Sequence, residues 1–420
     1  MNTTSLDQHV SQTLAPNGLT VLSEQLPAVR SAAVGIWVRT ASAHERRSQM
    51  GVSHLLEHMV FKGTERRTPR QLAQELESRG GMLDAFTGRD HTCFQAHILD
   101  VDLPRAVDVL TDLVHRPLLR ETDLSLERNV VLEEISTVED TPDDLVFELF
   151  ADRLWPQHPY GYSILGTRES VGAIRSQDLR QVHGAGYYRG NCVIAAAGQL
   201  EHERLLELLE KEGWFEEVGP EAPRPPLKGA PAVRGQTFRF ERDTAQCHMV
   251  LGSDAFPYRD PRRFALALLV NALGGGMSSR LFQRIREELG LAYAIYAFQQ
   301  LFESSGILGV YVGTKPGTAE AALDAIRHEY ATMARAGLSV EELAQGKQQL
   351  KGQILLALES SISRMNRLAG MVLHGEPYRR LDEIAALIDA VTLEDVRQVA
   401  AEFFAPERQT LARLGPEQAA

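Results

Sequence analysis

Two histidines and a glutamate in the segment His54-Leu55-Leu56-Glu57-His58 have the side chains and the spacing to hold and use a metal ion. On a helix, His54 and His58 lie one turn apart on one face, and with Glu57 they fall within an arc of roughly 100°. Two imidazoles can each give one ring nitrogen to a zinc ion, at about 2.0–2.1 Å. Glu57 would then stand beside the open coordination position, where a carboxylate can take a proton from water and pass it to a leaving amine. The segment therefore predicts a catalytic zinc helix.

The alternative is that both histidines are ordinary helix residues. A match to three fixed positions arises by chance in a chain of this length on the order of a few per cent of the time. The surrounding residues also favour a helix with one buried side, since the motif is flanked and filled by apolar side chains, namely Val52, Leu55, Leu56, Met59 and Val60. The metal interpretation is therefore preferred.

A catalytic zinc ion usually has three protein ligands and leaves the fourth position to water. The sequence LERNVVLEEISTVED at 126–140 predicts a helix on which Glu127 and Glu134, seven residues apart, share a face. We place Val130, Val131 and Val138 on the same face. Glu133 falls on the polar side of this helix. A ligand that packs against another helix should come from the apolar face, which selects Glu134 over Glu133 as the third zinc ligand.

The elements that would position these residues recur in two halves of the chain. A proline-rich stretch at 219–235 predicts a linker between an N-terminal zinc-binding domain, 1–218, and a C-terminal domain, 236–420. In the first half, helices are expected at about 50–62 and 121–139, and strands at 82–87 and 91–98. The second half repeats the order, with a helix at about 278–289 and strands at 292–302 and 305–313. We therefore predict two homologous α+β domains related by internal duplication.

Composition excludes several classes of function. The chain has 420 residues and a formal net charge of −12, which disfavours nucleic-acid binding because phosphate contacts need clustered Lys and Arg. The chain has no run of 18 or more apolar residues, so no membrane span is predicted. The N-terminus lacks the features of a signal or transit peptide. The three cysteines, Cys93, Cys192 and Cys247, are widely spaced and odd in number, as expected of reduced thiols. A cytoplasmic location is expected.

The segment GVSHLLEHMVFKGT, with Glu134 76 residues after His58, resembles the signature of the pitrilysin family, which includes insulin-degrading enzyme and the mitochondrial processing peptidase. HPYGYSILGT at 158–167 and GGGMSSRLF at 274–282 are also similar to segments of that family, and the chain looks most like its short bacterial members. The resemblance implies one Zn²⁺ per chain, with Glu127 as a further acidic residue near the metal. It also implies a fold that forms half of a clamshell, so that a second chain is needed.

The resemblance further implies a zinc metalloendopeptidase that hydrolyses extended peptides or small unfolded proteins inside a closed chamber. MLDAFT at 82–87 is similar to the strand along which the family binds peptides, which assigns substrate binding to Asp84, Ala85, Phe86 and Thr87. The family often has Asn where this chain has Asp84, which leaves open what that side chain does.

Arg286 and Tyr293, in RIREELGLAY, match a pair that the family uses from its second half, with Arg286 on the substrate backbone and Tyr293 on the developing oxyanion. Because one chain carries both this pair and the zinc helix, a homodimer would be self-sufficient, and a heterodimer with a related subunit is the other arrangement.

Two other functions remain open at this point. Some relatives with the same fold are non-catalytic scaffold or substrate-binding subunits. Such subunits typically have a broken zinc motif, whereas the motif is intact here. A measurement of zinc content would distinguish a zinc peptidase from a non-catalytic subunit. A zinc hydrolase of small molecules is the second alternative, and the predicted peptide-binding strand and the long second half argue against it.

Overall fold

The computed structural model describes residues 1–216, 219 and 227–416 and divides the chain into two compact units. The first consists of Met1–Ile135, the described part of Ser163–Pro226, and Ala357–Tyr378. The second consists of Ser136–Tyr162, Leu227–Leu356 and the described part of Arg379–Ala420. Each unit thus takes segments from both sides of the predicted linker at 219–235, of which residues 220–226 lie outside the described residues.

A seven-stranded sheet in the order β1-β2-β3-β7-β4-β6-β5 forms the centre of the first unit. Its strands are β1 (Asn2–Asp7), β2 (Val10–Leu14), β3 (Thr20–Gln25), β4 (Ser31–Val38), β5 (Met82–Thr87), β6 (Thr92–Leu99) and β7 (Cys192–Gly198). β4 and β7 are covered on both faces, which explains their almost uninterrupted small and apolar residues. The hairpin of β1 and β2 was not predicted, because its residues are mostly polar and partly exposed.

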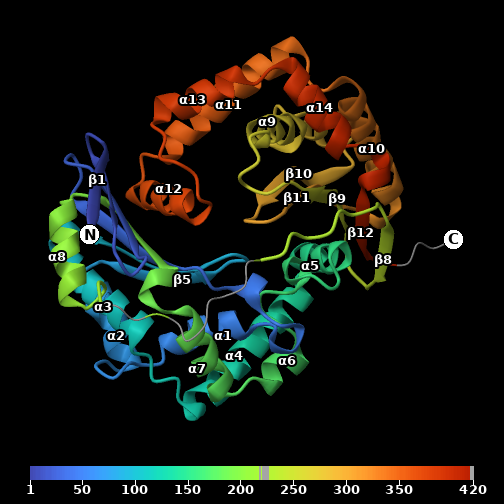
Figure 1. Cartoon of the computed structure of the whole chain (residues 1–420). Helices are drawn as coiled ribbons and strands as arrows, with labels where there is room; N and C mark the ends of the chain where they lie inside the picture. The colour runs from blue at the N-terminus through green and yellow to red at the C-terminus, as the bar shows by residue number, and fades with distance from the viewer. Residues whose placement is uncertain (217–218, 220–226, 417–420) are drawn as a thin grey trace. The chain divides into compact units, whose positions relative to one another are not determined.

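Helices cover both faces of this sheet. On one face, α1 (Val52–Val60), α3 (Leu103–His115) and α8 (His202–Lys211) bury apolar side chains against the strands. On the other face lies α12 (Ser361–Leu373), which comes from the C-terminal part of the chain (Figure 1). Its residues Met365, Leu368 and Ala369 belong to one buried apolar cluster with Trp37 of β4. The other helices of this unit are α2 (Pro69–Glu77), α6 (Arg168–Ala173), α7 (Ser176–Gly186) and most of α4 (Glu121–Asp140).

The second unit repeats the strand arrangement of the first. Its five-stranded sheet has the order β10-β11-β9-β12-β8, with β8 (Thr237–Glu241), β9 (Cys247–Ala255), β10 (Ala292–Leu301), β11 (Gly306–Thr314) and β12 (Thr410–Gly415). This order matches the order β5-β6-β4-β7-β3 in the first unit, strand for strand. In both sheets the last pair is parallel (β12 with β8, β7 with β3), and the other neighbouring strands in these two series are antiparallel. The shared topology confirms the prediction of two related α+β domains.

The second unit takes its helices from both halves of the chain, and one of them differs in type from the prediction. They are α5 (Pro142–Leu154), α9 (Arg263–Gly274), α10 (Ala319–Ala336), α11 (Val340–Ala357), α13 (Leu381–Ala390) and α14 (Leu393–Phe403). The helix expected at 278–289 is a π-helix over Phe282–Glu288.

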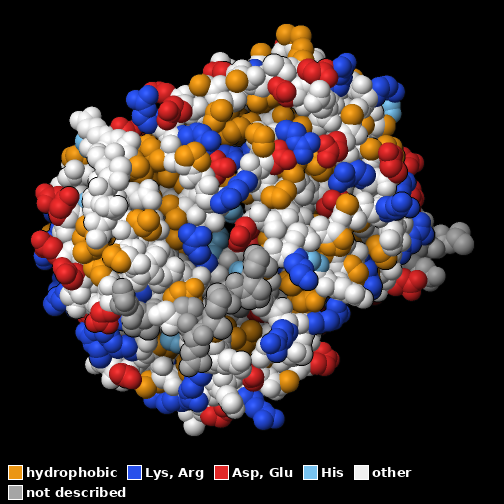
Figure 2. Space-filling model, in the orientation of Figure 1, with side chains coloured by type: hydrophobic (Ala, Val, Ile, Leu, Met, Phe, Trp, Pro, Cys, Tyr) orange, Lys and Arg blue, Asp and Glu red, His pale blue; other side chains and the backbone are white. Residues whose placement is uncertain are grey.

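None of the described helices is long and apolar enough to cross a bilayer. Figure 2 shows acidic and basic side chains interspersed over the face in view, so the net charge of −12 is not gathered into one patch there.

Candidate metal centre

The first two donors of the candidate metal centre come from α1. This helix buries Leu55, Leu56 and Met59 in the core, which leaves His54 and His58 on its accessible side with their ring centroids 4.7 Å apart. Burial, and then the charge of the neighbouring His58, lower the pKa of His54 to about 4. The His54 ring is therefore neutral at neutral pH and keeps a lone pair for a metal.

Glu134 on α4 completes the group. One carboxylate oxygen lies 3.7 Å from His54 Nε2 and the other 3.6 Å from His58 Nε2. Glu133 is exposed, as the helix-face argument predicts. Val130 was placed on the buried face, but that prediction is wrong: its side chain is 44% exposed, because it lies at the edge of the stripe formed by Glu127, Val131 and Ile135.

The residues fit a zinc ion. Two donors bound to a tetrahedral zinc ion at about 2.0–2.1 Å lie about 3.4 Å apart, close to the two His–Glu distances of 3.7 and 3.6 Å. One ligand atom from each of His54, His58 and Glu134 can be chosen so that all lie within 4.8 Å of one another. Glu134 Oε2 is buried without a hydrogen-bond partner, which is costly for a carboxylate oxygen unless something else pairs with it.

Glu127 orients the second histidine. It is buried on α4, and its Oε2 lies 3.2 Å from His58 Nδ1. The other oxygen, Oε1, lies 2.7 Å from Lys62 Nζ. Since a carboxylate paired with a lysine accepts hydrogen bonds, His58 donates from Nδ1 and presents Nε2 towards Glu134. Carboxylate–histidine pairs of this kind fix the ring of metal-binding histidines.

Glu57 lies beside these donors and is held by the end of strand β5. The Thr87 hydroxyl donates a 2.6 Å hydrogen bond to Glu57 Oε2. Burial raises the pKa of Glu57 above its usual value, while the bond from Thr87 opposes this. One carboxylate oxygen, Oε2, is thus engaged by the Thr87 hydroxyl.

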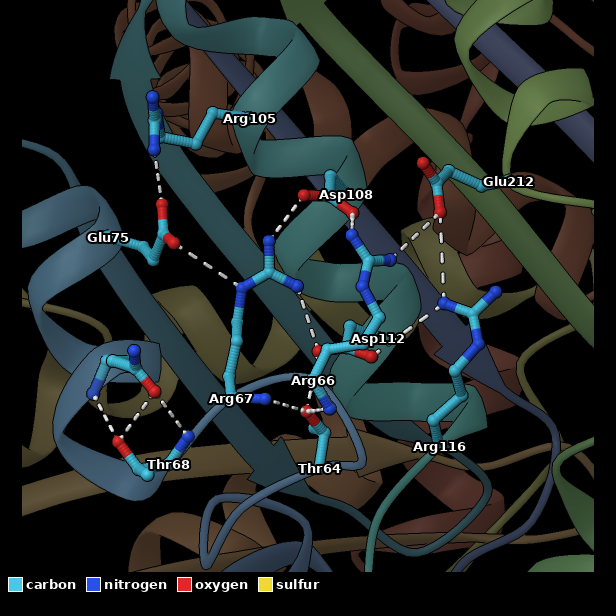
Figure 3. Close-up of polar contacts among 11 residues, drawn as sticks. Thr64, Arg66, Arg67, Thr68, Glu75, Arg105, Asp108, Asp112, Arg116 and Glu212 are labelled. Carbon is cyan, nitrogen blue, oxygen red and sulfur yellow. Dashed lines mark hydrogen bonds and ion pairs between the residues drawn. The ribbon is translucent and has the colours of Figure 1, made fainter.

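A network of charges fixes the segment that follows α1 (Figure 3). Thr64 Oγ1 donates to Asp112 Oδ2 at 2.6 Å, and Arg67 Nη1 donates to the same oxygen at 2.8 Å. Arg67 also pairs with Asp108, so this arginine, mostly buried, ties the loop to two acids of α3. The C-terminal end of the metal helix is thereby anchored to the core.

The predicted substrate strand is at the edge of the sheet. Among the described strands, β5 pairs only with β6, so its other side is open along Met82–Thr87. The side chains alternate between exposed, including Asp84 and Phe86, and partly buried, including Ala85 and Thr87. Asp84 accepts a 3.4 Å hydrogen bond from Gln95 Nε2 on β6.

Arg286 and Tyr293 lie together in the second unit. The guanidinium of Arg286, on the π-helix, is 4.6 Å from the centre of the Tyr293 ring, and it also covers Phe282 at 4.7 Å. Tyr293, near the start of edge strand β10, is 78% exposed. The two side chains thus form one stacked cluster, with the Tyr293 ring exposed.

Sequence reasoning missed three partners of the metal helix. They are Glu45, whose carboxylate accepts hydrogen bonds from Gly51 N and Ser53 N at the start of α1, Lys62, and the hydroxyl of Thr87, which was assigned only to substrate binding. Lys62 lies four residues after His58 in the familial segment, and that spacing was a usable signal. Nothing in the local pattern points to Glu45 or to the Thr87–Glu57 bond, because both contacts join residues from different elements.

The fold and this site define a two-domain α+β protein with a histidine–glutamate centre of the zinc peptidase type. The family described as Insulinase (Peptidase family M16) matches residues 20–168, and the one described as Peptidase M16 inactive domain matches residues 173–350. The chain belongs to peptidase family M16, which confirms the resemblance seen in the sequence.

Several relatives are similar over nearly the whole chain. An uncharacterized zinc protease of Streptomyces coelicolor is 37% identical over 413 residues, covering 97% of this chain and 90% of the relative. One of Mycobacterium leprae is 39% identical (97% and 92%), and YmxG of Bacillus subtilis is 36% identical (95% and 97%).

Two solved structures share the fold. The structure of a protease from Helicobacter pylori has a TM-score of 0.91 at 22% identity, covering 96% of this chain and 99% of that one. A peptidase M16 inactive domain from Pseudomonas fluorescens has a TM-score of 0.90 at 20% identity, covering 98% and 99%. At these identities the likeness concerns the fold.

Proposed function

We propose that this protein is a zinc-dependent endopeptidase that cleaves extended peptides. The observation that carries the proposal is the convergence of His54, His58 and Glu134, with Glu57 beside them and bonded to the last residue of an open edge strand. The relatives named zinc proteases support the choice of metal and of reaction class.

In this proposal each residue has a separate task. His54, His58 and Glu134 hold one zinc ion, which when bound supplies a Lewis acid that acidifies water and polarises a carbonyl. Glu57 accepts a proton on its free oxygen and delivers it to the leaving amine. Glu127 keeps His58 in the required tautomer.

In this proposal the substrate binds at the open edge of β5. An extended peptide can pair with the free backbone groups of Met82–Thr87 as an added strand, which makes few demands on its sequence. Thr87, the last residue of β5, is hydrogen-bonded to Glu57, so a peptide paired with β5 would run beside the metal centre. Arg286 and Tyr293 would contact the substrate backbone and the oxyanion, respectively.

The test compares Glu57→Gln with Glu65→Gln, which changes an exposed carboxyl after the metal helix. The native protein and Glu65→Gln should cleave a panel of flexible fluorogenic peptides, whereas Glu57→Gln should be inactive yet hold one zinc ion per chain. Zinc content is measured on the same preparations. Zinc binding by a native protein that cleaves none of the peptides would favour the non-catalytic alternative, and loss of zinc in Glu57→Gln would show that its assigned role is wrong.

A further inference from the structure

The metal helix lacks a capping side chain of its own. The first N–H groups of a helix need acceptors, which an Ncap Ser, Thr, Asp or Asn usually provides. The Ncap of α1 is Gly51, with φ of 89°, which has no side chain to offer.

Glu45 supplies the missing acceptors from outside the helix. Its Oε1 accepts a hydrogen bond from Ser53 N at 2.8 Å, and its Oε2 accepts one from Gly51 N at 2.8 Å. In a capping box two different side chains accept from the N3 and Ncap N–H groups; here the donors are the Ncap, Gly51, and the second helical residue, Ser53. Here a single carboxylate, placed by the short 3-10 turn Ser42–His44, serves both.

The packing around Gly51 explains why the cap cannot be local. A Cβ at Gly51 would lie 2.5 Å from the carbonyl oxygen of Leu165, and a Cβ at Gly166 would lie 2.4 Å from that of Met50. The two backbones touch at this point, and Ser170 Oγ donates to Met50 O at 2.7 Å. A conventional capping residue at position 51 would break this contact.

Burial makes the Glu45 cap hard to replace. Glu45 is 8% exposed. Burial raises the pKa of Glu45 to about 7, although the hydrogen bonds from Ser53 and Gly51 lower it. Buried N–H groups that lose their acceptor cost about 1–3 kcal/mol each, so the first turn of α1 depends on this side chain.

The position of that turn decides the position of a metal donor. Ser53, which donates to Glu45, directly precedes His54, and α1 has only nine residues. Short helices are marginal without tertiary contacts. Thr64 and Arg67 anchor the C-terminal side, whereas the N-terminal side is held by Glu45 and the Gly51–Gly166 contact.

We propose that Glu45 is a positioning residue of the metal centre, which caps α1 and thereby holds His54 and Glu57 in the orientation that zinc binding and proton transfer need. Glu45 acts through the helix and does not touch the donors. The inference rests on the proposed function for the identity of the metal.

The experiment measures the zinc dissociation constant of the metal-free full chain by competition with a chromogenic chelator. Glu45→Ala should weaken zinc binding about 10–100-fold, the range found when residues behind metal ligands are removed. Glu45→Gln keeps one acceptor and should fall between Glu45→Ala and the native protein. The same samples are followed by hydrogen exchange of the α1 amides, which should become faster in both variants.

Two controls separate positioning from general destabilisation. Glu121→Gln changes another helix-end carboxyl of the same unit, which accepts a 3.1 Å bond from Ser176 N at the start of α7. Leu368→Ala removes a fully buried side chain from α12, on the face of the sheet away from α1. Both should leave the zinc dissociation constant within about 2-fold of the native value.

Native zinc affinity in folded Glu45→Ala, or the same loss in Leu368→Ala, would overturn the inference. Should Glu45→Ala fail to fold, Glu45→Gln decides: weaker zinc binding supports the inference and unchanged binding refutes it. A native protein that binds no zinc would refute the proposed function instead. Hydrogen exchange in the metal-free protein would then decide the role of Glu45 by itself, since unchanged protection of α1 in Glu45→Gln contradicts the cap.

Discussion

Replacing Glu134 with glutamine should weaken zinc binding sharply, whereas the same change at Glu133 should not. The two carboxyls are adjacent on α4, but the oxygens of Glu134 lie 3.7 and 3.6 Å from the two histidine Nε2 atoms, and Glu133 is exposed. The pair is therefore matched in chemistry and helix position and differs only in the direction of the side chain.

The expected magnitude follows from the number of donors. Four-ligand structural zinc sites bind with about 10–16 kcal/mol, which is roughly 3 kcal/mol for each ligand. At 1.4 kcal/mol for each factor of ten, loss of one of the three protein donors should raise the zinc dissociation constant by about 100-fold. Because glutamine keeps the shape and one oxygen but not the charge, the fold should be retained, and circular dichroism checks this.

The assay is chelator competition on metal-free protein, with zinc content after gel filtration as a second measure. Native affinity in Glu134→Gln would remove this residue from the ligand set. An equal loss of zinc affinity in Glu133→Gln would mean either that the assigned face of α4 is not the one that points to the histidines, or that the loss has a general structural cause.

Two further predictions concern contacts that the structure adds. Thr87→Val should lower kcat about 10–100-fold with zinc content unchanged, because a hydrogen bond to a charged group contributes about 1.5–3 kcal/mol. The control Thr87→Ser keeps the hydroxyl and should stay near the native rate. Equal losses in both variants would argue against orientation of Glu57 by this hydroxyl. Burial lowers the pKa of His202, whose ring nitrogens lie 2.8 Å from the hydroxyls of Thr13 and Ser23. Because the unfolded chain then binds the proton more tightly, the stability that the neutral ring contributes is present above about pH 6.5 and is lost as the pH falls below it. Urea midpoints at pH 7.5 and 5.5 should therefore differ less in His202→Gln than in the native protein, and an equal difference would contradict this account.

The sequence by itself determined the parts of this protein that depend on local periodicity. Helical spacing places His54, Glu57 and His58 on one short helix, and the same geometry separates Glu134 from Glu133. The strand patterns at 82–87 and 91–98 predicted β5 and β6, and the repeated order of elements predicted two related domains. These patterns are readable because burial of one face imposes a fixed period on neighbouring residues.

Only the tertiary structure decided how other residues support that helix. Glu45 caps it, Lys62 and Glu127 orient His58, and the Thr87 hydroxyl engages Glu57. α12 joins the sheet of the first unit although it is encoded more than 150 residues after β7. The bonds of Thr87 to Glu57 and of Glu127 to His58 join residues far apart in sequence, so that no local period records them, and they exist only once packing of the core has brought the two backbones together. The Glu45 contacts span only six and eight residues, but they cross an irregular turn that has no period to read.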